Sequence, residues 1–212
     1  ETYFGRIHST PKPAPVRTVE PEQWGERHVK VEAKSQPILV VGYHRPQETH
    51  EDDAALEALA NIIGQGRSSR LWKLLVKKEK IAVQAGSFNG FPGSKFPNLI
   101  AFMAVSSKDH TSAECLALID QEIEKIKSES VTEDELTKFK QTQKKGIIDG
   151  MKSNSGMAGS LTHYDVVHGD WRKVFDQIAD VEKITADDVK RVANKYLFKK
   201  NRTIGEIVPE AE

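Results

Sequence analysis

Histidine is the residue type in this chain that most directly raises the question of metal chemistry. Zinc bound on a helix takes two ligands from one face, so its histidines lie three or four positions apart. His44 and His50 are six positions apart, and His163 and His168 are five apart. Neither His-Glu-x-x-His nor its inverse His-x-x-Glu-His occurs in the 212 residues. The sequence therefore predicts no metal site and no cofactor in this chain.

Nucleophilic catalysis finds equally little support. The single cysteine, Cys115, excludes an internal disulfide and a cysteine-based zinc cluster. It lies in a helical pattern beside Leu116 and Ile119, where a cysteine usually serves as a small apolar side chain. No Gly-x-Ser-x-Gly nucleophile elbow is present. We expect no catalytic residue in this chain.

A glycine-rich segment with two arginines, residues 64–70, is the remaining candidate for ligand chemistry. Glycines ahead of a helix N-terminus can hold an anion, and Arg67 and Arg70 would add positive charge. The segment is not a P-loop, because no Lys-Ser/Thr follows in register and a helix rather than a strand precedes it. Two interpretations stay open: a substrate-binding segment that uses both arginines, and a helix–turn–helix connection with a serine cap.

The charge and composition of the chain exclude broad classes of function. Its 31 Lys+Arg balance 31 Asp+Glu, so it lacks the long-range attraction typical of nucleic-acid binders. The longest apolar runs, residues 38–41 and 99–105, are far shorter than the roughly 20 residues of a membrane helix, so we expect no membrane insertion. Because the sequence begins at Glu1 rather than Met, we expect a truncated N-terminus. Both a periplasmic and a cytoplasmic location stay open.

Prolines set apart the N-terminal part of the chain. Four of the nine prolines lie within the first 23 residues, at positions 11, 13, 15 and 21. Because proline fixes φ and cannot donate to a β-ladder, residues 9–24 are predicted to form an extended linker. Residues 1–8, with aromatic Tyr3 and Phe4, are predicted to be the tail of a preceding domain. Residues 25–212 are predicted to form one folded domain.

The predicted secondary structure begins with strands. Residues 29–33 alternate apolar and polar side chains, which predicts a half-buried strand. Residues 38–43 form a continuous apolar strand, typical of the centre of a sheet. Further strands are expected at residues 82–88, 99–105 and 203–208, and helices at residues 51–63 and 69–75, where Ser68 or Ser69 could cap the second helix.

Later helices are marked by capping boxes, in which a threonine side chain and an acid three residues on satisfy each other's backbone N–H groups. The three boxes are Thr111 with Glu114, Thr132 with Glu135, and Thr185 with Asp188. Residues 136–178 are predicted to be mostly helical, with breaks at 154–156 and 168–170. Because the strands come in pairs, hairpin-like antiparallel pairing is expected. The order of elements predicts an α+β fold, a two-layer sandwich with a largely antiparallel sheet and helices packed on one face.

One block of sequence closely resembles a known family. Residues 59–75, LANIIGQGRSSRLWKLL, are similar to a signature of the pitrilysin/insulinase-like zinc metallopeptidases, which include the mitochondrial processing peptidase subunits. Residues 3–5 resemble the end of the preceding domain in those proteins, and residues 169–171 and 184–197 resemble their C-terminal helices. The resemblance implies the LuxS/MPP-like metallohydrolase fold.

The resemblance is to the second, non-zinc domain of the family's bilobed unit. In such proteins a first domain carries His-x-x-Glu-His plus a distal Glu; the histidines bind zinc and the motif Glu activates water. The resemblance therefore implies that zinc belongs to a homologous partner domain. This chain would then be the inactive C-terminal domain, with a peptide as the substrate.

The resemblance also points to one candidate site residue. In peptidase members, the second domain contributes an Arg and, seven residues later, a Tyr that hold the substrate backbone and polarise the scissile carbonyl. Tyr164 matches the Tyr position, but Met157 stands where the Arg would be. Methionine can neither donate a hydrogen bond nor carry charge, so half of the pair is absent. Tyr164 keeps two interpretations, a substrate contact and a helix-packing residue.

Two functions follow from these observations. The leading hypothesis is a non-catalytic C-terminal domain of a zinc metallopeptidase, which pairs with a zinc-bearing domain to enclose and position peptides. The alternative is a purely structural or interaction subunit, related to the protease but without a proteolytic role. Met157 favours the alternative.

Overall fold

The computed structural model describes residues 2–3, 5–8, 10–11, 14, 16 and 19–210. The strands are β1 (Arg27–Ala33), β2 (Ile38–Arg45), β3 (Ala82–Phe91), β4 (Asn98–Ser106) and β5 (Arg202–Pro209). The helices are α1 (Asp53–Gly64), η1 (Trp72–Lys78), α2 (Ser112–Ser128), α3 (Glu133–Gly150), α4 (Asn154–His168), η2 (Trp171–Phe175), α5 (Gln177–Lys183), α6 (Ala186–Tyr196) and η3 (Lys199–Asn201). The predicted tail (1–8) and linker (9–24) include residues outside those described, so both boundaries stay predictions.

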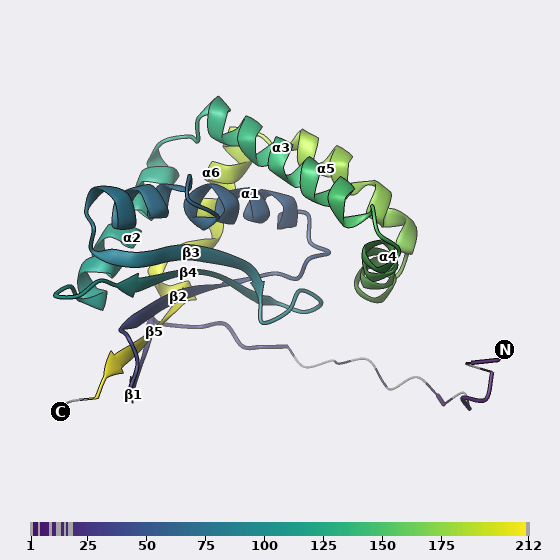
Figure 1. The fold of residues 1–212 in the computed structure, drawn as a ribbon, viewed down its shortest axis with the longest axis horizontal. Helices are drawn as coiled ribbons and strands as arrows, with labels where there is room; N and C mark the ends of the chain where they lie inside the picture. Colours follow the sequence, from purple (N-terminus) through teal and green to yellow (C-terminus); the bar gives the residue numbers. More distant parts are fainter. Residues whose placement is uncertain are drawn as a thin grey trace.

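The strands form one sheet in the order β1-β5-β2-β4-β3, and the helices lie on one side of it (Figure 1). Every neighbouring pair of strands is antiparallel except β1 and β5, which run parallel. This arrangement confirms the predicted α+β two-layer sandwich. β2 lies at the centre of the sheet, as its continuous apolar sequence predicted.

The expected hairpin between β1 and β2 is wrong, because β5 lies between them. Contacts of two β5 residues favour its position between β1 and β2. Ile204 of β5 is fully buried under the helices, and the nearly buried guanidinium of Arg202 pairs with Glu26 ahead of β1 and with Asp120 on α2. β5 therefore stabilises the sheet with contacts that the local pattern of β1 and β2 cannot reveal.

The prediction that β1 is half-buried is also wrong. Val29 and Val31 are 52% and 51% exposed, although they alternate with charged residues as a half-buried strand would. β1 is the outer strand of the sheet, it pairs with β5 alone, and it lies beyond the helical layer (Figure 1). The alternation of apolar and charged residues therefore distinguishes the two faces of β1. It does not show whether helices cover either face.

The core lies between the sheet and α1, α2 and α6. Tyr43 of β2 and Phe102 of β4 meet edge to face there, with ring centroids 6.2 Å apart. Eight of the twelve residues of α1 are buried, so this helix is the main apolar contact of the sheet. Cys115 is buried on α2 with its thiol 3.6 Å from the Ser106 hydroxyl, which agrees with its interpretation as a small packing residue.

All three predicted capping boxes are present, at the starts of α2, α3 and α6. The break predicted at residues 154–156 lies slightly earlier, because Ser153 caps α4 by accepting a hydrogen bond from the backbone N–H of Gly156. The second predicted break is at Gly169, which ends α4 in the left-handed conformation, with a φ of 74°. The glycine adopts this φ without the steric strain that a side chain would add.

The start of α1 is fixed by a buried carboxylate rather than by a side-chain cap. Asp52 occupies the N-cap position but makes no capping hydrogen bond. Its fully buried carboxylate instead accepts hydrogen bonds from Arg191 at 2.5 Å, Lys195 at 2.7 Å and the Tyr196 hydroxyl at 2.6 Å, all on α6. The first turn of α1 is thereby tied to α6, and it forms one wall of the cleft described below.

Candidate functional site: an acidic cleft beside Tyr164

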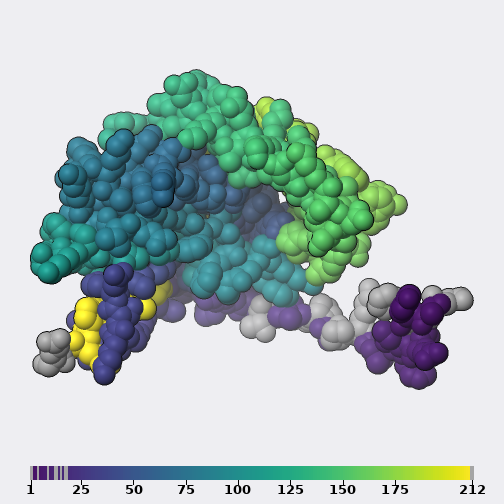
Figure 2. Space-filling model, viewed as in Figure 1, coloured from purple at the N-terminus to yellow at the C-terminus, as the bar shows by residue number. Residues whose placement is uncertain are grey.

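The helices α3, α4 and α5 stand away from the sheet and leave a cleft of about 610 Å³ between themselves and α1. Figure 2 shows the hollow beneath the green overhang of these helices. The near wall is the loop before α1 together with the first turns of α1. The far wall is formed by α3, the end of α4, η2 and α5.

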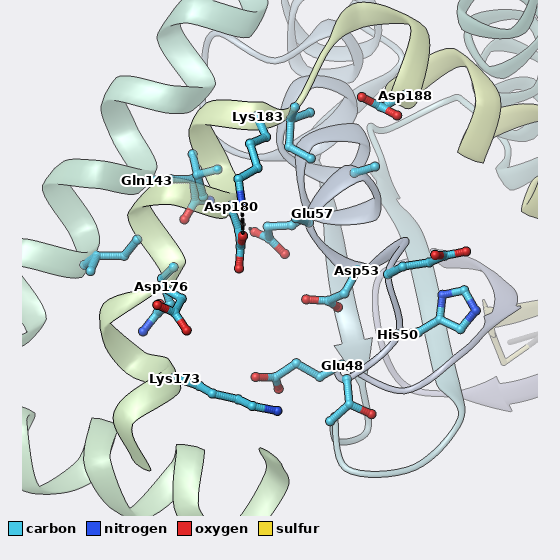
Figure 3. A pocket seen from close by; sticks show the side chains of 18 of the residues that line it. Glu48, His50, Asp53, Glu57, Gln143, Lys173, Asp176, Asp180, Lys183 and Asp188 are labelled. Atoms are coloured by element: carbon cyan, nitrogen blue, oxygen red, sulfur yellow. Dashed lines mark hydrogen bonds and ion pairs between the residues drawn. The ribbon is translucent and has the colours of Figure 1, made fainter. Parts of the chain in front are cut away.

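Carboxylates dominate the walls of this cleft. Seven acidic residues line it against three cationic ones. The acids are Glu48, Glu51, Asp53, Glu57, Asp176, Asp180 and Asp188, and the cations are Lys173, Lys183 and Arg191. In Figure 3 the carboxylates of Glu48, Asp53 and Glu57 point from the near wall toward the far wall. The cleft therefore presents negative charge to anything that enters it.

Asp53 shows the electrostatic consequence of this crowding. Burial raises its pKa above the ordinary value, and the nearby carboxylates of Glu48 and Glu57 act in the same direction. The guanidinium of Arg45 opposes this rise, with its Nη2 2.5 Å from Asp53 Oδ1.

Tyr164 lies in this cleft, on the inner side of the last turns of α4. Its ring stacks on the imidazole of His168, with centroids 4.5 Å apart and planes 7° from parallel. Burial raises the pKa of Tyr164 well above its ordinary value, and the carboxylates of Glu48 and Asp53 raise it further. The phenol therefore stays protonated and can donate a hydrogen bond. Among the described residues, no protein acceptor for the Tyr164 hydroxyl is found.

Glu48 links the two walls of the cleft. It lies in the loop between β2 and α1 and meets two histidines of α4: His168 Nε2 is 3.0 Å from Oε1, and His163 Nε2 is 2.9 Å from the same oxygen. Burial raises the pKa of Glu48, but hydrogen bonds from Ser94 and the two histidines outweigh this and lower it below the ordinary value. Glu48 is therefore an ionised anchor for α4.

Met157 lies seven residues before Tyr164 on α4, about two turns away on the same face. It is half-buried and is not among the residues that line the cleft. The position implied for an arginine by the resemblance therefore contributes no donor to the cleft.

The two arginines of residues 64–70 lie outside this cleft. Arg70 forms a bidentate pair with Glu135 on α3, with both N···O distances 2.7 Å, and reaches Glu122 on α2 at 3.1 Å. Arg67 lies over the Trp72 ring at 5.9 Å, beside a separate shallow hollow. The structure does not bring either arginine to Tyr164, and their role in substrate binding stays a prediction.

Among the described residues, the His, Cys, Asp and Glu side chains form no group of three or more that could hold a metal ion. The described helices also include none with the length and apolar character needed to cross a membrane. Sequence reasoning missed Glu48 and the acidic cleft. No local signal could have found Glu48, since its partners lie 115 and 120 residues further along the chain.

Comparison with known proteins identifies the family. The family profile described as "Peptidase M16 inactive domain" matches residues 1–143, about two thirds of the chain. The chain belongs to this family. The resemblance of residues 59–75 to the pitrilysin/insulinase-like metallopeptidases is thereby confirmed, as is the interpretation as an inactive domain of that family.

Similar proteins agree with this placement of the chain in the M16 family. The zinc protease PqqE of Helicobacter pylori is 32% identical over 181 residues, which are 84% of this chain and 40% of that protein. The crystal structure of a protease from Helicobacter pylori superposes with a TM-score of 0.88 at 28% identity, over 98% of this chain and 51% of that one. An inactive peptidase domain from Bordetella parapertussis matches with a TM-score of 0.75 at 25% identity, over 86% of this chain and 95% of its own. This M16 chain thus spans about half the length of the Helicobacter proteins.

Proposed function

We propose that this chain is the non-catalytic C-terminal domain of a zinc metallopeptidase, which pairs with a homologous domain bearing His-x-x-Glu-His. Together the two domains would enclose and position a peptide. The observation that carries the proposal is Tyr164: a protonated phenol in an open cleft, with no protein acceptor found among the described residues. Such a group is available to donate to a peptide carbonyl.

The zinc is assigned to the partner domain. The described residues of this chain offer no ligand group for it, and a bound zinc would supply activation of water and polarisation of a carbonyl. The contribution of this chain is then to wall off the site, to orient the peptide, and to hold the Tyr164 proton toward the carbonyl oxygen.

The uncovered face of the sheet supports a pairing role. The strand register places Val29 and Val31 of β1, Val40 of β2 and Phe88 of β3 on the face opposite the helices. These side chains are 37–52% exposed. An extended apolar surface of this kind is uncommon on a solitary soluble domain and usually marks an interaction site. In the proposed unit this surface would contact the zinc-bearing domain.

The test compares the chain alone with the chain joined to its zinc-bearing half. Zinc content and chelator-sensitive hydrolysis of an unfolded peptide are measured for each preparation. The proposal predicts zinc and hydrolysis only in the joined protein. One zinc per chain and hydrolysis by this chain alone would contradict it.

The purely structural alternative is favoured by Met157, which removes the charged donor expected beside Tyr164. Under this alternative the joined protein binds zinc but cleaves no unfolded peptide, and Met157→Arg leaves it inert. Under the peptidase proposal, Met157→Arg adds a second donor on the same face of α4 and raises the rate of hydrolysis.

A further inference from the structure

The helix α4, which carries Tyr164, is only partly buried against the rest of the domain. None of its fifteen residues is fully buried. Its main neighbours are η2, which follows it directly in the chain, and the end of α3, which precedes it. These contacts join α4 only to the elements next to it in the sequence. They do not fix the distance between α4 and α1 across the cleft.

Glu48 supplies a link across the cleft. Its carboxylate oxygens lie 2.9 and 3.1 Å from His163 Nε2, and one of them lies 3.0 Å from His168 Nε2. Its side chain is only 17% exposed, and its backbone N–H donates to the Ser94 carbonyl at 2.9 Å. The loop before α1 and the loop between β3 and β4 therefore hold Glu48 firmly, and Glu48 in turn holds α4.

The connection continues from Glu48 to the phenol of Tyr164. Tyr164 and His168 are four residues apart on α4 and so share one face of the helix. The imidazole of His168 is fixed at its Nε2 by Glu48 while its face lies against the Tyr164 ring. Because the two rings stack, a change in the position of the imidazole would alter the position and surroundings of the Tyr164 ring.

We infer that Glu48 is a positioning residue for Tyr164, acting through His168 and, from the side, through His163. This inference rests on the proposed function of Tyr164 as a substrate contact. It adds that the orientation of the phenol is set by a carboxylate from the opposite wall of the cleft rather than by the packing of α4.

The direct test is a fluorine NMR spectrum of the chain labelled with 3-fluorotyrosine. The chain has four tyrosines, and the Tyr164 signal is identified as the one absent from Tyr164→Phe. Glu48→Gln and His168→Gln are expected to shift and broaden the Tyr164 signal, because the phenol loses its fixed neighbour. His163→Gln is expected to give a smaller change in the same direction, and it provides a second variant should Glu48→Gln fail to fold.

A matched control is available at the start of α2, where His110, just before the helix, and Glu114 form another histidine–carboxylate pair at 3.3 Å, away from the cleft. Glu114→Gln keeps the capping box, since glutamine serves at this position. It is expected to leave the Tyr164 signal unchanged. A Tyr164 signal unaltered by both Glu48→Gln and His163→Gln would overturn the inference.

A second readout separates positioning from general stability. In the chain joined to its zinc-bearing half, Glu48→Gln should lower kcat/KM for an unfolded peptide by up to roughly 100-fold, the loss that small misplacements of catalytic groups can cause. The double variant with Tyr164→Phe should be no slower than Tyr164→Phe alone, because Glu48 acts through Tyr164. If Tyr164→Phe leaves hydrolysis unchanged, the role of Tyr164 in the proposed function fails, while the fluorine shift still decides the positioning by Glu48. Additive losses in the double variant would overturn the inference.

Discussion

The helices α1 and α4 face each other across the cleft but differ sharply in how they are held. In α1, eight of twelve residues are buried against the sheet, whereas in α4 none of fifteen is fully buried. The position of α1 follows from its apolar contacts with the sheet. Besides its contacts with η2 and α3, α4 is held across the cleft by polar contacts of Glu48 with two histidines. The difference separates a region that stabilises the fold from the region that carries Tyr164, the proposed substrate contact.

The largest expected contrast between the two helices comes from removing a leucine side chain in each. Leu59 of α1 is fully buried, and Leu59→Ala should destabilise the chain by about 2–5 kcal/mol through lost burial and a residual cavity. Leu161 of α4 is only partly buried, and Leu161→Ala should lower stability by about 1 kcal/mol or less. Urea denaturation of both variants measures the difference. Equal losses would show that α4 is packed as tightly as α1.

Glycines in the two helices should respond in opposite directions to alanine. At Gly64, the end of α1, an added Cβ would lie 2.5 Å from Ser87 Cβ and 2.7 Å from Ser87 N, so Gly64→Ala should cost about 1–3 kcal/mol. At Gly159 of α4 nothing lies within 4 Å of the added Cβ. Gly159→Ala should stabilise the helix by up to about 1 kcal/mol through its higher helix propensity. Thermal unfolding of both variants checks the two signs, and a destabilising Gly159→Ala would count against an open face on α4.

The ion pair between Arg70 and Glu135 ties α3 to the rest of the domain, so its effect should depend on pH. Burial raises the pKa of Glu135, but hydrogen bonds from Arg70 and Thr132 outweigh this and lower it to about 2, below the ordinary value of 4.5. A carboxylate with a lowered pKa stabilises the fold above its ordinary pKa, and this contribution is lost as the pH falls from 4.5 toward about 2.

Arg70→Met should therefore destabilise the chain at neutral pH by about 1–2 kcal/mol, a value reduced for partial solvent screening. Urea denaturation at neutral pH and again in acid should show the difference between variant and wild type shrinking in acid. A difference that stays constant across this range would mean that Arg70 acts through packing rather than through charge.

The smallest expected effect is confined to α4. Ser153 caps this helix, with its hydroxyl 3.0 Å from the backbone N of Gly156. Ser153→Ala should destabilise the first turn by about 0.5–1 kcal/mol, in line with other lost N-caps. Hydrogen exchange should quicken at the start of α4 and stay unchanged in α1. Faster exchange in both helices would contradict the independence of the two regions.

Much of the fold could be predicted because its signals are local. The three capping boxes and the turn at Gly169 each depend on residues within a few positions, and the structure contains all of them. The placement of β5 between β1 and β2 could not be predicted. It depends on contacts of Arg202 and Ile204 with segments far away in the sequence.

The candidate site shows the same limit. Tyr164 was proposed from a resemblance, and the structure places it in the cleft. Glu48, its histidine partners and the opposing carboxylates come from separate elements that meet only in the folded chain. The pattern of a single sequence carries no information on such long-range contacts. Each of these residues resembles an ordinary solvated polar side chain on its own helix or loop.

The most direct test of the account is the hydrolysis of an unfolded peptide by the chain joined to its zinc-bearing half, with and without Tyr164→Phe. The variant is expected to keep its zinc and its fold but to lose roughly 100-fold in kcat, the scale seen when one hydrogen-bond donor to a developing oxyanion is removed. A variant that hydrolyses the peptide as fast as the wild type would contradict the central claim, that this inactive domain contributes the Tyr164 hydroxyl to the chemistry of its partner.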